Sequence, residues 1–332
     1  MRRRAFLGLA AASGWTACSR QRSVRSRTPV RVAMSPYFGS SAFYLAQETG
    51  LFEAAGFQVE VERSPGPAQT IPLLAGGKLD VSSSALSPAL ISAVARGGRV
   101  RIVACMQRTS PGCGDAGTIY GRRSVFPNGL ADLRQLKGKR VAIQGQANIG
   151  EFWLDVVLET AGLSSDDVML VNLRIPEALA ALTAGKIDAM VGAHSILDES
   201  RLASAQVVRS IGFGRVLPNF HTHHVLFGAS LLAGDPERGS RFLAAYFQAV
   251  RDFLGGKTPK FLVDFARESG VDPEVVKKAC RDTFPADGTI SPENLQYFID
   301  WSVRKGYTQA GMRAEQLVDA RFLERVQRGN KP

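Results

Sequence analysis

The sequence predicts an α/β protein with two equivalent lobes, each a mostly parallel sheet flanked by helices, and a helical C-terminal region. Three observations predict this: strand and helix patterns alternate from Val30, the alternation restarts near Arg140 with similar residues, and helical patterns replace it from Pro236. Strands that alternate with helices of about 10–15 residues form parallel sheets covered on both faces. The chain of 332 residues is long enough for about two such units.

The first lobe has short apolar runs separated by helical segments with recognisable ends. Expected strands cover residues 30–34, 59–61, 79–82 and 101–104. A helix from Ser40 to Glu48 begins at a serine and is followed by Gly50. A later helix begins after Ser87 with Pro88 in its first turn.

The second lobe repeats the first at a nearly constant offset. Residues 140–143 match residues 31–34 at an offset of 109, and residues 152–154 then fall on residues 43–45. Residues 182–189 (Leu-Thr-Ala-Gly-Lys-Ile-Asp-Ala) match residues 74–81 (Leu-Ala-Gly-Gly-Lys-Leu-Asp-Val) at an offset of 108. Three matched segments in the same order predict two lobes of the same design.

The domain organisation follows from this repeat. We expect lobe one in residues 29–119, lobe two in 120–219, and a return strand, the remainder of lobe one and the C-terminal helices in 220–332. Those helices are expected over residues 236–254, 259–269, 273–284, 292–305 and 314–327. Because two segments cross between the lobes, the lobes should form a hinged clamp with its ligand beyond the carboxyl ends of the strands.

The first 28 residues have the pattern of an export signal and a tether. Residues 1–17 have a positive start, an apolar stretch and small residues near a cleavage point, as in a secretory signal peptide. Arg3-Arg4-Ala5-Phe6-Leu7 resembles a twin-arginine export signal, and Thr16-Ala17-Cys18 resembles a lipoprotein box in which Cys18 is lipidated. An ordinary cleaved signal with an incidental cysteine is the alternative. Residues 18–28 are polar and basic and are expected to form a flexible tether.

The net charge of +11 belongs mostly to this leader. Seven arginines and no acidic residue precede residue 29, and without them the net charge falls to +4. No apolar run reaches the ~18–20 residues of a membrane-spanning helix. We therefore expect an exported protein of the periplasm or cell envelope that meets the membrane only through a lipid anchor and binds no nucleic acid.

The three other cysteines have different expected roles. Cys105 and Cys113 lie eight residues apart across a loop that contains glycine and proline, so a disulfide between them is predicted in an oxidising compartment. Cys280, on the expected helix 273–284, is interpreted as a small core residue.

Motifs in both lobes resemble a known family. Lobe one contains Pro36, the run from Tyr44 to Gly56 (Tyr-Leu-Ala-Gln-Glu-Thr-Gly-Leu-Phe-Glu-Ala-Ala-Gly) and Leu-Ala-Gly-Gly-Lys-Leu-Asp, and lobe two contains the runs 133–142 and 177–189. These segments resemble the nitrate/sulfonate/taurine and thiamine-pyrimidine group of solute-binding proteins of bacterial ABC importers. The resemblance covers about residues 29–235. It implies a two-lobed periplasmic-binding-protein fold, a small-molecule ligand, and an ABC permease with its cytoplasmic ATPase as partner.

One departure from the family leaves the ligand class open. Many members carry Glu-Pro shortly after the strand that contains Asp-Ala, where this chain has His194-Ser195.

Candidate ligand residues lie at the tips of the expected strands. Lobe one offers Tyr37, Phe38, Ser40, Ser41 and Ser84, and lobe two offers Gln144, Gln146, Asn148, Gly192 and His194. No Lys or Arg stands at these tips, so an anion would rely on helix N-termini and neutral donors. Helix capping is the alternative role for Ser40 and Asn148, and lobe packing for Tyr37 and Phe38. Asp80 and Asp188, each at the entry to a strand, are expected to have structural turn roles.

The return segment is rich in histidine. On an extended strand His221 and His223 share a face and His224 opposes them. We expect His194, His221 and His223 to contact the ligand, with an affinity that varies between about pH 5 and 8. Zinc or copper binding is the alternative, but no carboxylate or cysteine neighbour completes a metal shell, so no metal is expected.

Signatures of catalysis are sparse. The sequence has no Gly-x-Ser-x-Gly, Walker or Cys-x-x-Cys motif, and residues 145–150 lack a full dinucleotide fingerprint. We therefore expect a protein that is not an enzyme: a monomeric, cofactor-free solute-binding component of an ABC importer that captures a sulfonate, nitrate, taurine or pyrimidine. The alternatives are a thiamine-pyrimidine synthase-like enzyme on the same fold and a metal-binding receptor that uses the histidines.

Overall fold

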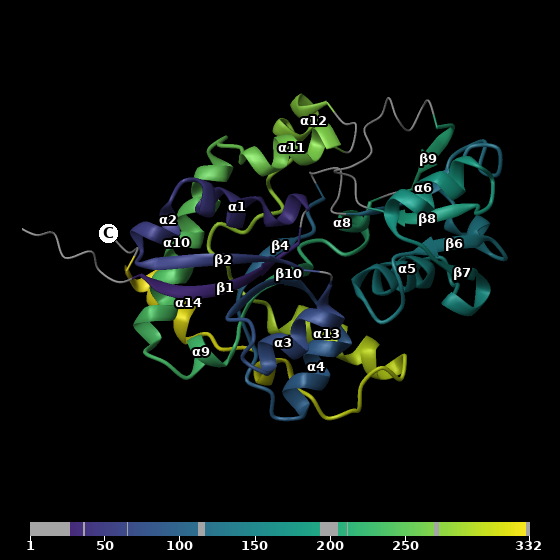
Figure 1. Ribbon diagram of the computed structural model, residues 1–332. Coiled ribbons are helices and arrows are strands. Elements are labelled where there is room, and N and C mark those ends of the chain that lie inside the picture. The colour runs from purple at the N-terminus through teal and green to yellow at the C-terminus, as the bar shows by residue number, and fades with distance from the viewer. Residues whose placement is uncertain are drawn as a thin grey trace, which may run out of the picture.

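Two five-stranded sheets form the centre of the protein in the computed structural model (Figure 1). The structure describes residues 27–35, 37–64, 66–111, 117–192, 205–210, 212–268 and 272–329. The first sheet has the order β2-β1-β3-β10-β4, with β1 (Thr28–Met34), β2 (Phe57–Arg63), β3 (Val81–Ala85), β4 (Arg101–Arg108) and β10 (His221–Phe227). The second has the order β7-β6-β8-β5-β9, with β5 (Thr118–Arg122), β6 (Arg140–Ile143), β7 (Met169–Asn172), β8 (Ala189–Gly192) and β9 (Val207–Arg209). The predicted two-lobed α/β architecture is confirmed.

The two sheets share one pattern of strand directions. β1 is parallel to β2 and β3, and β6 is parallel to β7 and β8. β10 is antiparallel to β3 and β4, and β5 is antiparallel to β8 and β9. Each sheet therefore has one antiparallel strand, β10 or β5, and in both cases it is the first strand formed after the chain crosses from the other sheet. The second sheet begins at Thr118, so the expected boundary between lobe one and lobe two, after residue 119, falls inside β5. Thr28, expected to belong to the tether, is the first residue of β1.

Helices surround both sheets. Lobe one has α1 (Ser41–Glu48), α2 (Leu51–Ala54), α3 (Pro67–Ala75), α4 (Pro88–Ala95) and α9 (Ala229–Leu232). Lobe two has α5 (Ile149–Thr160), α6 (Ile175–Thr183) and α8 (Phe213–Val216). The C-terminal region has α10 (Pro236–Leu254), α11 (Lys260–Glu268), α12 (Pro273–Lys277), α13 (Pro292–Arg304) and α14 (Arg321–Gly329). Short 3-10 helices are η1 (Phe38–Ser40), η2 (Leu133–Leu136), η3 (Ser165–Asp167) and η5 (Ala314–Leu317).

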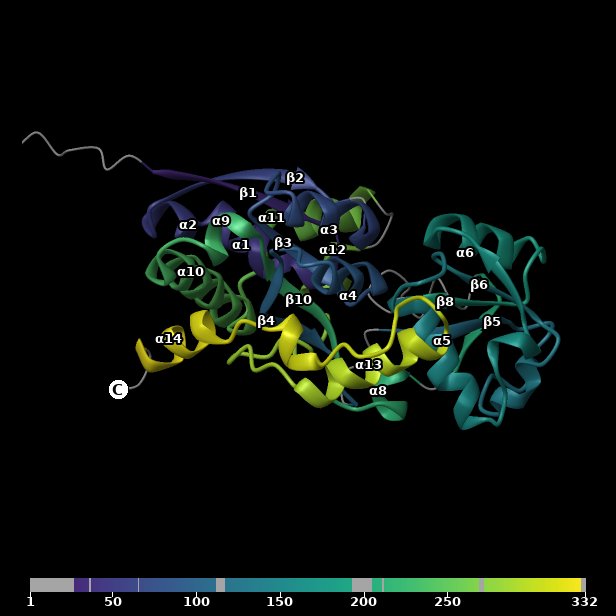
Figure 2. The ribbon, with the colours of Figure 1, turned by 90° about the horizontal axis from the view of Figure 1, so that it is seen from below.

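The C-terminal helices cover the lobes in two different ways. α10 and α14 pack with α1 and α2 over one face of the first sheet and bury a cluster that includes Phe43, Phe242 and Tyr246. On the opposite face α13 lies beside α3 and α4 (Figure 1). α13 also reaches lobe two, because its Phe298 and Trp301 rings lie 5.2 and 5.4 Å from the ring of Phe152 in α5. Figure 2 shows α13 next to both α4 and α5, so the two lobes share one apolar core at this side.

The same charged turn stabilises the start of each lobe. Asp80 accepts hydrogen bonds from the backbone N–H of Arg31 (2.8 Å) and from its guanidinium Nε (3.2 Å). Asp188 accepts the same two bonds from Arg140, at 3.0 and 3.1 Å. Both carboxylates lie at the beginning of a strand, at the edge away from the strand tips. The interpretation of Asp80 and Asp188 as structural residues is confirmed.

The end of the chain is more broken than its periodicity predicts. The expected helix 273–284 ends at Lys277, and residues 278–284 turn back so that the Arg281 guanidinium donates to the Lys257 carbonyl (3.1 Å). The expected helix 314–327 is two elements, since Val318 leaves the helix to form a bridge with Ile102.

The cysteines differ from the sequence-based expectation. Cys105 lies inside β4, is fully buried and has a free thiol, so the predicted Cys105–Cys113 disulfide is wrong. The physical reason is that β4 continues to Arg108 and holds Cys105 inside the sheet. Cys280 is neither helical nor in the core: it is exposed in the loop after α12 and is disulfide-bonded. Cys18 and Cys113 lie outside the described residues. Within the described ranges, no helix is long and apolar enough to cross a membrane.

Candidate functional site

The carboxyl edge of the first sheet gathers polar residues from four strands. β1, β3 and β4 end at this edge, and β10 begins there because it runs antiparallel to β3 and β4. The start of β10 therefore brings His221, His223 and His224 to the tips of the other strands. The sequence alone identified these histidines but gave them no position relative to β1 and β4.

Tyr37 and His223 form an aromatic pair at this edge. Their ring centroids are 4.9 Å apart, and Thr222 Oγ1 lies 3.0 Å from His223 Nδ1. The Tyr37 hydroxyl is buried near Ser40 and has no hydrogen bond of ordinary geometry among the described residues, and its burial raises the pKa of the phenol. A phenol, an imidazole and a hydroxyl thus meet where the first strand ends.

The other lobe-one candidates have mainly internal contacts. Ser40 is fully buried and its Oγ lies 3.2 Å from Ser83 Oγ on β3, so it joins two strand tips instead of capping α1. Ser41 donates to the Phe38 carbonyl (2.6 Å), and Ser84 donates to the Ala85 carbonyl (3.2 Å). Phe38 packs edge-on against Phe253 and Phe284, which favours its core-packing role. Of these serines, Ser40 is the one whose side chain acts on the Tyr37 phenol.

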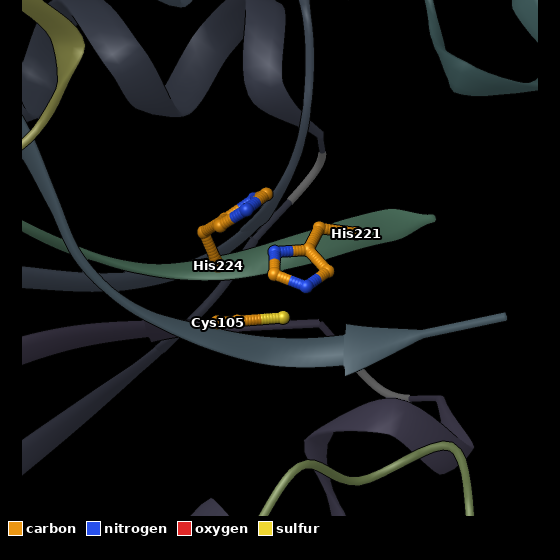
Figure 3. Close-up of side chains that lie close together, drawn as sticks. All are labelled: Cys105, His221 and His224. Carbon is orange, nitrogen blue, oxygen red and sulfur yellow. The ribbon is translucent and has the colours of Figure 1, made fainter. Parts of the chain in front are cut away.

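The histidine strand departs from regular alternation. The pairing of β10 with β4 shifts between His221 and His223 and again between His223 and His224. These irregularities place His221 and His224 together beside Cys105, while His223 contacts Tyr37 (Figure 3). The predicted common face of His221 and His223 is therefore wrong, because a bulged strand does not alternate with a period of two. Two residues outside the sheet hold His221. The backbone N–H of His221 donates to Asn294 Oδ1 (2.9 Å), and its ring Nδ1 accepts from the backbone N–H of Ser291 (3.2 Å).

A cysteine and two histidines form a compact buried group at the same edge. Cys105 Sγ and one ring nitrogen each of His221 and His224 all lie within 4.8 Å of one another. Figure 3 shows the three side chains facing one another from β4 and β10. The expectation that the histidines have no cysteine neighbour is wrong. Tertiary structure supplies one, because β4 and β10 are adjacent although more than 100 residues separate them.

The electrostatics of the edge are set by burial and by one arginine. Burial is the main cause that lowers the pKa of His221 and of His223 to about 4, and for His221 the Arg108 guanidinium contributes to this lowering. Both imidazoles are therefore neutral throughout pH 5–8, so the expected pH window moves down toward pH 4. Arg108 ends β4 at this edge, and its Nε is buried without a partner in the part of the chain that is described. The expectation that no Arg stands at the tips is wrong, because β4 is four residues longer than the predicted strand.

The lobe-two tip satisfies its polar groups internally. Asn148 Oδ1 accepts from the N–H groups of Gly150 (2.8 Å) and Glu151 (3.2 Å), which confirms helix capping as one of its roles. Gln144 and Gln146 are exposed. Gly192 ends β8, where an added Cβ would meet the Tyr120 ring at 3.0 Å. His194 lies outside the described residues.

These features define a class of protein. Two α/β lobes of matching topology, with polar groups at a carboxyl edge, form the periplasmic-binding-protein fold. The alkanesulfonate-binding protein SsuA of Xanthomonas axonopodis pv. citri, solved bound to MOPS, matches this chain with a TM-score of 0.69 and 20% identity over 89% of this chain and 99% of that chain. The predicted fold is confirmed.

The family is defined by sequence. The family described as NMT1/THI5 like matches residues 38–255, so this chain belongs to it. A 4-amino-5-hydroxymethyl-2-methylpyrimidine phosphate synthase of Schizosaccharomyces pombe is 27% identical over 277 residues, which are 79% of this chain and 77% of that protein. A Brucella abortus protein named as a binding protein is 28% identical over 191 residues, and the match spans 57% of this chain and about half (54%) of that protein. The predicted family resemblance is confirmed.

Proposed function

We propose that this protein is the solute-binding component of an ABC importer and that it captures a small polar organic solute or anion between its lobes. The observation that carries the proposal is the carboxyl edge of the first sheet, where the Tyr37–His223 pair lies beside Ser40. Ligands of open α/β sheets bind beyond the carboxyl ends of the strands, where loops supply polar groups. The fold supports the same conclusion, because it offers two such edges.

The chemistry of the edge favours a planar or anionic solute. Aromatic faces bind planar groups by stacking, and a guanidinium such as that of Arg108 pairs with an oxyanion through two parallel hydrogen bonds. The candidate classes are therefore sulfonates, taurine, nitrate and pyrimidines. The proposed contacts in lobe one are Tyr37, Ser40, His221 and His223, together with Arg108. Those in lobe two are Gln144, Gln146 and His194.

An enzyme that acts on a pyrimidine precursor is the second candidate. It is favoured by the Schizosaccharomyces pombe relative, whose match extends over 79% of this chain and whose name describes a phosphate synthase. The expected export signal argues against it, because synthesis of that kind is intracellular.

The cellular placement belongs to the same proposal. Residues 1–17 would direct export to the periplasm or cell envelope, Cys18 would carry the lipid anchor, and an ABC permease with its ATPase would receive the solute. Mass spectrometry of the mature protein tests the anchor: a lipidated N-terminal Cys18 is expected, and a mature N-terminus elsewhere would contradict it.

The function is tested by solute binding to the purified chain. Thermal shift and calorimetry are run with taurine, an alkanesulfonate, nitrate and a hydroxymethylpyrimidine. We expect one class to stabilise the protein by about 2–3 kcal/mol at a concentration ~100 times its Kd. Tyr37→Ala should abolish that effect, Arg108→Gln should weaken only anionic ligands, and Arg96→Gln, at an exposed residue of lobe one, should change neither. Turnover of a pyrimidine precursor without reversible binding would favour the enzyme, and no response to any of the four would refute the proposal.

A further inference from the structure

We propose that Cys105, His221 and His224 form a metal site for a borderline-soft transition ion, with Zn²⁺ as its natural occupant. The three donor atoms lie within 4.8 Å of one another and their residues are buried, at 0%, 7% and 1% exposure. One thiolate and two imidazoles form a donor set that suits zinc and disfavours the oxygen-seeking ions Mg²⁺ and Ca²⁺. The inference is independent of which solute the protein binds.

His224 gives the strongest reason to expect an occupant. Neither of its ring nitrogens has a hydrogen-bond partner among the described residues, and both are buried. A buried polar group without a partner destabilises the folded state, so a native core rarely leaves both nitrogens of one imidazole unsatisfied. A metal ion would bind one of these nitrogens directly.

The other two donors, Cys105 and His221, make only weak hydrogen bonds that a metal ion would replace. Among the described residues, the free thiol of Cys105 has only long contacts to carbonyl oxygens, at 3.6 Å from Gln107 and 3.9 Å from His223. The neutral ring of His221 has one lone pair, which now accepts a 3.2 Å hydrogen bond from the Ser291 N–H. Metal binding replaces that bond and releases the thiol proton of Cys105 to solvent, while the ion gives up bound water. No oxidation or reduction is involved.

The geometry needs a small adjustment. Zinc holds sulfur at about 2.3 Å and nitrogen at about 2.0–2.1 Å, so tetrahedral donors lie about 3.3–3.6 Å apart. The donors therefore have to approach by about 1 Å, which rotation of three side chains can supply. A fourth position remains for water or another exogenous donor.

Two surrounding charges act on the site in opposite directions. Arg108 and Asp287 are the charged groups whose fields act on both Cys105 and His221, and their effects oppose each other. Arg108 favours the thiolate, and Asp287 favours a bound cation. The neighbouring Tyr37, His223 and Tyr246 are neutral, so these three side chains add no charge that would repel the ion.

The test is titration of the purified, chelator-treated chain with Co²⁺, followed by displacement with Zn²⁺. Co²⁺ bound to a thiolate gives a sulfur-to-cobalt charge-transfer band, and tetrahedral Co²⁺ gives intense visible bands. We expect one equivalent of Co²⁺ per chain, both spectral features, and their loss when Zn²⁺ is added. Circular dichroism confirms that each variant is folded.

The variants separate this site from other donors. Cys105→Ser should remove the charge-transfer band, and His224→Gln should weaken metal binding by more than about tenfold, because even the loss of an outer-shell partner costs 10–100-fold. His223→Gln is the matched control, since His223 contacts Tyr37 and lies outside the cluster, and it should bind Co²⁺ like the parent chain. The absence of a one-to-one complex, a charge-transfer band that survives in folded Cys105→Ser, or unchanged affinity in His224→Gln would overturn the proposal.

Discussion

α1 and α5 are the equivalent helices of the two lobes, and they solve the same packing problem differently. The repeat aligns Phe43 of α1 with Phe152 of α5, and both rings are fully buried. Phe43 packs on Tyr246 of α10 with ring centroids 4.5 Å apart, whereas Phe152 packs on Trp301 of α13. Each lobe therefore relies on a C-terminal helix to bury its repeated aromatic residue.

The two helices differ in their charges. α5 carries two buried carboxylates, Glu151 and Asp155, and the Lys305 ammonium lies 3.1 and 3.2 Å from them. Trp301 Nε1 donates to Asp155 (2.8 Å), and the Tyr307 hydroxyl donates to Glu151 (2.8 Å). α1 has no buried carboxylate within the described residues. The acidic residue at its end, Glu48, is exposed and accepts hydrogen bonds from the first N–H groups of α11.

The same difference extends to the strand tips of the two lobes. In lobe two the polar groups at the tip are satisfied by Asn148 and Glu151, which accept backbone hydrogen bonds at the start of α5. In lobe one the corresponding edge leaves the Tyr37 hydroxyl and both ring nitrogens of His224 without a hydrogen-bond partner among the described residues. Duplicated lobes thus share their supporting structure and diverge where a ligand would bind.

The largest expected loss of stability comes from removing the ion pairs between Lys305, at the end of α13, and the two carboxylates of α5. Lys305→Met leaves two buried carboxylates without their cation, so we expect the free energy of unfolding to fall by about 3–5 kcal/mol in a denaturant titration. Lys260→Met, at an exposed pair with Asp264 on α11, is the control and should cost less than about 0.5 kcal/mol. A similar small loss in both variants would mean that the aromatic contacts alone hold α13 to α5.

The next effect tests whether the two charged turns are equivalent. Asp188→Asn and Asp80→Asn should each cost about 2 kcal/mol, because each removes charge-assisted bonds from an arginine. A clear difference between the two losses in the free energy of unfolding would show that the two turns share a geometry but stabilise the protein to different extents.

The acid dependence of stability sharpens the same comparison. Hydrogen bonds from the Arg140 side chain lower the pKa of Asp188 to about 2, compared with 3.8 ordinarily. The stabilisation is thus complete above about pH 4 and is lost as the pH falls through about 2. We expect this carboxyl to contribute about 1–2 kcal/mol after solvent screening is allowed for. Unfolding of Asp188→Asn measured from pH 5 to 2 should show a shallower acid limb. Asp132→Asn, at a solvent-exposed pair with Arg134, should change the slope less.

The smallest expected effect compares the two helix N-termini. Asn148→Ala should cost about 1 kcal/mol of stability, because it removes a side-chain cap. Its effect on solute affinity should be small. Ser40→Ala should leave the capping of α1 unchanged, because Ser40 bonds to Ser83 instead, and should alter solute affinity through its neighbour Tyr37. The reverse pattern would move the candidate site to lobe two.

The sequence by itself determined much of the design. Local periodicity located most strands and helices, and the match between residues 31–34 and 140–143 predicted the duplicated lobes. The structural roles of Asp80 and Asp188 followed from their position at the entry to a strand. These features are local or repeated, so one chain carries enough information to predict them.

Only the tertiary structure decided which residues meet. The register shifts of β10 turned His221 and His224 toward one side, and the adjacency of β4 brought Cys105 to them. The length of β4 placed Arg108 at the edge, and α13 supplied Ser291 and Asn294 to hold His221. Contacts of this kind depend on strand order and register over separations of about 70 to more than 100 residues. Side-chain periodicity carries no information about such contacts.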